Sequence, residues 1–236
     1  MERLNPAYKF LTILIVGIIL SFSFNIRVNF GVFLLSVLMT LSSRNLEYKK
    51  FFFWLSVFAL CALGFFMTGL LFSKNIDSSE IGNWGFATIS VSSLETALRL
   101  SSRILAFGSL ALLFSMTTRP SSFFHSLRQQ FKIPAKFTYG VLAAYGFLPT
   151  IKNEYVLVRA AVSVRGVKAG PLSPRLLYPM LVRSFRRAEN VAMAMESRGF
   201  NPKAERGEAF PVPLGPVDIL FSASFVAAVV FGLIFL

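Results

Sequence analysis

The feature that most constrains the fold of this chain is a series of long apolar runs. They lie at about residues 10–24, 28–41, 51–72, 98–118 and 217–236, each bounded by charges or turn-forming residues. A helix that crosses the hydrocarbon core of a bilayer needs about 20 predominantly apolar residues, and the longer runs reach that length. With 55% hydrophobic and only 15% charged residues, the chain is too apolar for a soluble domain. The sequence predicts an all-α integral membrane protein with about five transmembrane helices.

The first two runs are short and are joined by residues 25–27. They predict a tight helical hairpin, or a pair in which one helix does not fully cross. Arg3 and Lys9 precede the first run, as in a secretory signal. Because another apolar segment follows almost at once, a retained first span is favoured.

The charge is concentrated in one region. The net charge is +13, and residues 119–210 hold 15 of the 24 Lys and Arg against 5 of the 11 acidic residues. Basic segments of membrane proteins stay on the cytoplasmic side. The apolar stretch at 137–150 has 14 residues and contains Pro149, so it is too short to span, and a crossing there would separate two basic segments.

The apolar runs and the charge distribution predict three parts of the chain. Residues 1–118 hold transmembrane helices 1–4, residues 119–210 form a cytoplasmic region of long amphipathic helices, and residues 211–236 form a C-terminal transmembrane helix. The N-terminus is predicted inside. Residues 73–97, in which acids outnumber the single Lys74, are predicted to form an external loop.

The basic region has three helical patterns, at 120–135, at 137–165 with a kink at Pro149, and at about 175–198. The first is an amphipathic interfacial helix. The third has an apolar face, with arginines mostly opposite. That face comprises Leu177, Leu181, Phe185 or Ala188, Ala192 and Met195, and the polar side comprises Arg183, Arg186, Arg187 and Asn190.

Small and flexible side chains gather near the end of the third helix, at Ala188, Ala192, Met193 and Met195. Ala and Met favour close, adaptable packing against another helix or a partner's groove. For the methionines taken singly, ordinary core packing is the favoured explanation.

The second and third of these helical patterns each run into an Arg-Gly pair, Arg165-Gly166 and Arg198-Gly199. Gly is common just past a helix end, and Arg in the last turn interacts favourably with the helix dipole. Two such ends in one basic region also present two guanidinium groups at helix tips. Since Arg makes bidentate contacts with carboxylates, the pairs indicate docking to a partner.

Two further arginines, Arg99 and Arg103, lie one turn apart at the outer end of the fourth run. Snorkelling to the interface and a polar contact with a neighbouring helix both remain open for them.

No catalytic or cofactor chemistry is visible. The chain has no G-x-x-x-x-G-K-[ST] loop for nucleotide phosphates, and its one cysteine, Cys61, and one histidine, His125, cannot make a usual zinc site. Basic residues are not interleaved with aromatics as in a nucleic-acid-binding module, so no nucleic acid partner is expected. Two rival classes stay open, a self-sufficient channel or secondary transporter and a membrane-embedded transferase.

Residues 97–120, 146–166 and 181–200 resemble the transmembrane T component (EcfT/CbiQ family) of energy-coupling factor (ECF) type ABC transporters. The resemblance covers most of the chain and is most specific in these three segments, "ALRLSSRILAFGSLALLFSMTTRP", "GFLPTIKNEYVLVRAAVSVRG" and "LVRSFRRAENVAMAMESRGF". Family members carry two Ala-Arg-Gly signatures at the ends of coupling helices. Here the matching triplets are Val164-Arg165-Gly166 and Ser197-Arg198-Gly199, with Val and Ser in place of Ala.

The resemblance implies a non-catalytic coupling subunit in the membrane of a bacterial or archaeal cell. Its implied partners are two ABC ATPase subunits that bind the two triplets, a substrate-binding S component, and the bilayer. No cofactor is implied in this chain, and ATP-Mg belongs to the ATPase subunits. The cargo, a vitamin or a transition metal, is not readable from this sequence.

Overall fold

The computed structural model describes residues 4–43, 47–72, 80–84, 87–166, 170–171, 173–201, 204, 207 and 211–235. The chain forms two compact units. Unit 1 comprises Met1–Ser126 and Val212–Leu236, and unit 2 comprises Leu127–Pro211. The sequence predicted three parts of the chain and the side of the membrane on which each lies. These sides remain a prediction.

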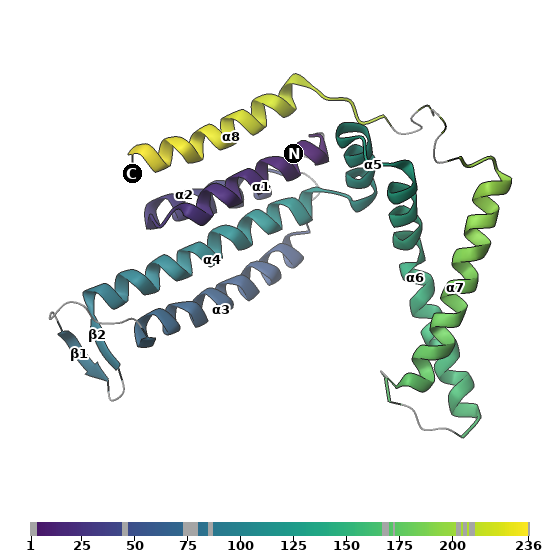
Figure 1. The fold of residues 1–236 in the computed structure, drawn as a ribbon. Coiled ribbons are helices and arrows are strands. Elements are labelled where there is room, and N and C mark those ends of the chain that lie inside the picture. The colour runs from purple at the N-terminus through teal and green to yellow at the C-terminus, as the bar shows by residue number, and fades with distance from the viewer. Residues whose placement is uncertain are drawn as a thin grey trace. The chain divides into compact units, whose positions relative to one another are not determined.

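Unit 1 contains five complete helices, the start of α5 (Pro120–Phe131) and a short β-hairpin (Figure 1). The complete helices are α1 (Pro6–Phe22), α2 (Ile26–Leu41), α3 (Tyr48–Phe72), α4 (Val91–Thr117) and α8 (Pro216–Phe235). Within the part of the chain that is described, α3, α4 and α8 are long and apolar enough to cross a membrane, and α1 and α2 are shorter apolar helices. The predicted all-α membrane fold is confirmed.

The predicted loop at 73–97 is partly wrong. Residues Glu80–Trp84 (β1) pair antiparallel with Ala87–Ser90 (β2), and α4 already begins at Val91. The loop was predicted because acidic residues outnumber Lys74 in 73–97 and because Gly82 and Gly85 are typical of loops. Glu95, one of these acids, lies on α4 with Arg99. The two form an ion pair of 3.3 Å one helical turn apart on α4, an arrangement that supports a helix. Residues 73–79 and 85–86 lie outside the described residues.

Helix α4 packs against α1, α2 and α3 and is the centre of unit 1. The apolar core joins it to α8 as well, through Val16, Leu20, Val28, Val32, Ala106, Leu110, Phe225 and Val229. Small polar residues let α2 and α4 approach closely, and Ser36 Oγ donates to Ser109 Oγ at 2.6 Å. Small residues and hydroxyl contacts are the usual means of helix association in a bilayer.

Polar contacts also fix α1 to α8 and α4. The backbone N–H of Asn5 donates to Asp218 Oδ1 at 2.7 Å, and Asp218 Oδ2 accepts from the N–H of Gly215 at 2.9 Å. The buried Lys9 donates from Nζ to Thr117 Oγ1 at 3.0 Å. Since Asp218 and Lys9 are buried, these bonds satisfy groups that would otherwise destabilise the fold.

Arg103 makes the contact with a neighbouring helix that the sequence left open. Its guanidinium donates to the carbonyl oxygen of Ser21 in the last turn of α1 and lies 5.6 Å from the Phe24 ring centroid and 6.0 Å from that of Phe107. A cation at a helix C-terminus interacts favourably with the helix dipole. Arg99 instead pairs with Glu95 on its own helix.

Unit 2 consists of the end of α5 (Pro120–Phe131) and two long helices, α6 (Ala135–Val164) and α7 (Pro174–Ser197). The three helices predicted at 120–135, 137–165 and 175–198 are confirmed, with α5 ending four residues early. Helix α6 continues through Pro149. As predicted, the helix containing residues 137–150 is not among the described helices that are apolar enough to span.

Candidate functional site

Both Arg-Gly pairs end a helix, as the sequence predicts. Arg165 is the C-cap of α6, and Gly166 follows with a φ of 72°. Arg198 is the C-cap of α7, and Gly199 follows with a φ of 78°. These φ values lie in the left-handed region, where Gly has no steric penalty, so each glycine turns the chain away just beyond the arginine.

The hydrogen bonds explain the sharp ends. At the end of α7 the Gly199 N–H donates to Glu196 O at 2.9 Å and the Phe200 N–H donates to Met195 O at 2.8 Å. This is the Schellman motif, which satisfies the last carbonyl groups of a helix. The Gly166 N–H makes the corresponding bond to Ser163 O at 2.9 Å.

All six residues of the two triplets are exposed. They are Val164, Arg165, Gly166, Ser197, Arg198 and Gly199, and the Val164 side chain is 88% exposed. Neither Arg165 nor Arg198 forms an ion pair with another described residue. The two guanidinium groups are therefore available for a contact with an anionic group of another molecule.

The two triplets lie at opposite ends of an antiparallel helix pair, which the sequence analysis did not derive. The Phe200 ring beyond the end of α7 is 5.8 Å from the Tyr139 ring near the start of α6. Tyr155 OH, in the second half of α6, donates to Pro171 O just before α7. Because α7 has 24 residues, it is about 36 Å long at 1.5 Å per residue, and a similar distance separates the tips.

One ion pair joins the middle of the two helices. Arg187 Nη1 lies 3.1 Å from Glu154 Oε1, and the Arg187 guanidinium lies 5.8 Å from the Phe147 ring centroid. Arg187 was grouped with Arg183 and Arg186 on the polar side of α7. In the structure Arg187 is half-buried towards α6, whereas the other two are exposed. The signal in the sequence was Glu154, the only acidic residue of α6.

The predicted apolar face of α7 is exposed within unit 2. Leu177, Leu181 and Phe185 are 40%, 56% and 69% exposed, and the face that is covered instead includes the buried Leu176. Of the four predicted packing residues, Met195 is half-buried, and Ala188, Ala192 and Met193 are exposed. Their packing against a partner stays a prediction.

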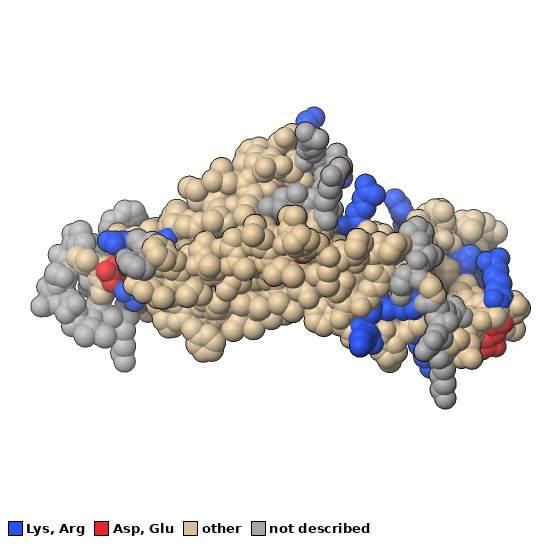
Figure 2. Space-filling model, turned by 90° about the horizontal axis from the view of Figure 1, so that it is seen from above, with Lys and Arg blue, Asp and Glu red and all other residues tan. Residues whose placement is uncertain are grey.

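Unit 2 is strongly basic. It has 14 Lys and Arg residues and 5 acidic residues, and Figure 2 shows basic side chains gathered over this unit, whereas the middle of the visible surface of unit 1 carries little charge. The described residues include no group of three or more His, Cys, Asp or Glu side chains placed to hold a metal ion. Unit 2 therefore presents an electropositive surface.

Comparisons with known proteins identify the family of this chain. A family model described as "Cobalt transport protein" (CbiQ) matches residues 1–208. The chain is 26% identical over 220 residues to the energy-coupling factor transporter transmembrane protein EcfT of Macrococcus caseolyticus, covering 87% of this chain and 82% of the relative. It is 24% identical over 243 residues to the protein of that name from Ruminiclostridium cellulolyticum, covering 93% and 86%.

A further relative with the same name, from Exiguobacterium sibiricum, is 30% identical over 150 residues. That alignment covers 57% of this chain and 56% of the relative, so the chain matches about half the length of this protein. The family match extends over both units and includes both Arg-Gly triplets. The chain is a membrane protein that belongs to the CbiQ family of cobalt transport proteins.

Proposed function

We propose that this chain is the transmembrane coupling subunit of an ECF-type ABC importer. It transmits a conformational change of two ABC ATPase subunits to a separate membrane subunit that binds a vitamin or a transition metal ion. The chain itself is non-catalytic, and ATP-Mg is bound and hydrolysed by the ATPase subunits. Unit 2 lies on the cytoplasmic side of a bacterial or archaeal cell membrane.

The observation that carries the proposal is the pair of exposed arginines at the two ends of the α6–α7 pair. Arg165 and Arg198 lie at helix tips whose separation is about one α7 length, roughly 36 Å. One globular ATPase subunit at each tip fits this spacing. Arg suits bidentate contact with a carboxylate, so an acidic groove on each ATPase subunit is the expected counterpart.

The exposed apolar face of α7 supports a second contact. Leu177, Leu181 and Phe185 are uncovered within unit 2, and such a face on a basic amphipathic helix suits a membrane surface or an apolar partner helix. We assign it to the substrate-binding subunit. A helix pair that holds ATPase subunits at its tips and the substrate-binding subunit along its side couples the two mechanically.

The test is co-purification of the ATPase subunits with the tagged full-length chain expressed with its natural partners. Breaking a desolvated Arg–carboxylate contact costs about 2 to 5 kcal/mol. Arg165→Glu and Arg198→Glu should each reduce ATPase retention more than tenfold, and the double variant should abolish it together with uptake. Helix content and membrane insertion should stay unchanged, because both side chains are exposed.

Arg183→Glu and Arg186→Glu are matched controls, since they make the same charge change at exposed positions in the middle of α7. They should retain the ATPase pair. Full ATPase retention and uptake in the double tip variant would refute the proposal. Uptake by the purified chain alone in vesicles would support the rival class of self-sufficient transporters, and no ATPase in the wild-type pull-down would argue for a different assembly.

A further inference from the structure

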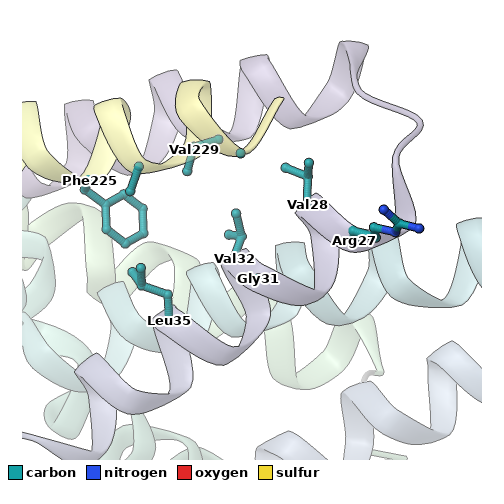
Figure 3. Close-up of a pocket in the computed structure, with 9 residues that line it drawn as sticks. Arg27, Val28, Gly31, Val32, Leu35, Phe225 and Val229 are labelled. Carbon is teal, nitrogen blue, oxygen red and sulfur yellow. The ribbon is translucent and has the colours of Figure 1, made fainter. Parts of the chain in front are cut away.

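A groove in unit 1 lies between α2 and α8, with a volume of about 160 Å³. Figure 3 shows it lined by side chains from both helices, with Arg27 at one end. The remaining lining is apolar: Val28, Gly31, Val32, Leu35, Phe225, Ala228, Val229 and Gly232. Gly31 and Ala228 are exposed, so the groove opens on the outer surface of the unit.

The glycines make the groove deep enough for a chain of methylene groups. A Cβ at Gly31 would meet no atom within 4 Å, and at Gly232 it would meet only Val28 Cγ2, at 4.0 Å. Neither glycine is therefore needed for close helix contact. Their effect is to leave the surface hollow.

The position of the groove limits what fills it. Both lining helices are apolar, and α8 is long enough to cross a membrane, so the opening faces acyl chains. Arg27 and Leu35 are eight residues apart on α2, or about 12 Å at 1.5 Å per residue. One leaflet of the hydrocarbon core is about 15 Å thick, so the groove follows an acyl chain over most of its depth.

Arg27 is not explained by the contacts or the position of α2. It is exposed, its guanidinium has no ion pair among the described residues, and it lies in the first turn of α2, where the helix dipole disfavours a cation. The predicted orientation places it on the external side, where Arg is not favoured either. An anionic group in the headgroup layer accounts for a cation at this place.

We propose that the α2–α8 groove binds one phospholipid with a net negative headgroup. The acyl chain lies along Gly31, Val32 and Ala228, and Arg27 contacts the headgroup phosphate. An acyl chain gains little from moving out of surrounding lipid into an equally apolar groove. The shape of the groove therefore retains the lipid, and Arg27 selects a lipid whose headgroup is negatively charged.

The test is native mass spectrometry of the full-length chain in an uncharged detergent. The protein is mixed with equal amounts of phosphatidylglycerol and phosphatidylcholine that carry the same acyl chains. A single basic residue near a membrane surface favours an anionic lipid about fivefold, and the wild-type chain should retain phosphatidylglycerol over phosphatidylcholine by about that ratio. Arg27→Gln should bring the ratio to about one without changing phosphatidylcholine retention.

Gly31→Leu places its Cβ in open space, extends an apolar side chain into the groove and should lower retention of both lipids severalfold. Its matched control is Gly64→Leu on α3, where a Cβ also meets nothing within 4 Å but no lining residue of the groove is changed. Arg99→Gln is the control for charge, because Arg99 is exposed and already paired with Glu95. Both controls should match the wild type.

Equal retention of the two lipids by the wild type would overturn the proposal, as would unchanged retention in Gly31→Leu or equal losses in the controls. The other possible occupant of the groove is a helix of another subunit. A photo-crosslinking residue in place of Ala228 distinguishes such a helix from a lipid. Cross-links to lipid in the assembled transporter support the proposal. Cross-links to protein alone would overturn it.

Discussion

The helices of unit 1 pack closely together, whereas those of unit 2 make few contacts with each other. In unit 1, α3 and α4 approach so closely that a Cβ on Gly69 would lie 2.5 Å from Ala97 Cα. In unit 2, the buried residues of α6 and α7 are only Thr138, Val158 and Leu176, and an ion pair joins their middle. Unit 1 is held by close contacts between its helices, whereas unit 2 leaves apolar and basic side chains of α7 exposed.

This difference predicts unequal sensitivity to substitution. Tightly packed helices lose stability when a single atom is added. Loosely joined helices tolerate changes at most positions and depend on the few residues that make their contacts. Substitutions that break a contact between helices should therefore have larger effects than matched substitutions at neighbouring positions.

The largest effect is expected for Gly69→Ala in unit 1. The new methyl group would overlap the backbone of Ala97, which cannot move without shifting α4. Overpacking of this kind costs about 1 to 3 kcal/mol, and we expect the upper end because the obstacle is backbone. The measurement is loss of helical circular dichroism during titration of the purified chain with sodium dodecyl sulfate.

Gly64→Ala is the control for this prediction. Gly64 lies five residues earlier on the same helix, and a Cβ there would meet nothing within 4 Å. Its transition should equal that of the wild type or move slightly towards higher stability, because Ala favours helix more than Gly. Equal destabilisation by the two substitutions would mean that α3 and α4 are not in close backbone contact.

This glycine pair also marks the limit of what the sequence predicts. Apolar runs and charge bias predict the helices, the basic region and the Arg-Gly helix ends, because length, hydropathy and local capping set these features. Gly64 and Gly69 look alike in the sequence, since both interrupt one apolar run. Only the tertiary contact of α3 with α4 makes one of them indispensable.

The same limit explains what was missed at the candidate site. The apolar periodicity of α7 admits two neighbouring faces, one through Leu176 and one through Leu177. The face predicted from the sequence is the one that the structure leaves exposed. The opposite placement of Arg165 and Arg198 was missed because it depends on the antiparallel pairing of α6 with α7, which no local pattern specifies.

A smaller effect is expected at the helix ends of unit 2. Gly199 has a φ of 78°, and an L-residue in the left-handed region costs about 1 to 2 kcal/mol. Gly199→Ala should therefore increase amide hydrogen exchange in the last turn of α7. Gly146→Ala, in the interior of α6 with open space around the new methyl group, should slow exchange in α6 instead. Slower exchange in both variants would contradict a left-handed Gly199.

The next effect concerns the Glu154–Arg187 pair. The two side chains are 15% and 39% exposed, so water weakens their attraction, and we expect Arg187→Gln to cost about 1 kcal/mol. Amide exchange should rise in peptides from both α6 and α7. Arg186→Gln, at the neighbouring exposed position, should leave exchange unchanged. An equal rise in the two variants would mean that net charge, rather than this contact, stabilises the helix pair.

The smallest effect is a gain in stability at Lys132, which has a φ of 52° and is the one non-glycine residue with a positive φ in the described ranges. It occupies the turn between α5 and α6, whereas the positive φ values just beyond α6 and α7 fall on the glycines Gly166 and Gly199. Lys132→Gly removes the steric cost and should stabilise this turn by about 0.5 kcal/mol, because the greater freedom of glycine in the unfolded chain offsets part of the gain. Exchange at the end of α5 should slow accordingly. Lys152→Gly makes the same substitution at an exposed position in the interior of α6 and should speed exchange there, since glycine weakens a helix interior by about 1 kcal/mol. If both variants sped exchange, the turn would be held by the lysine side chain and not strained by its backbone.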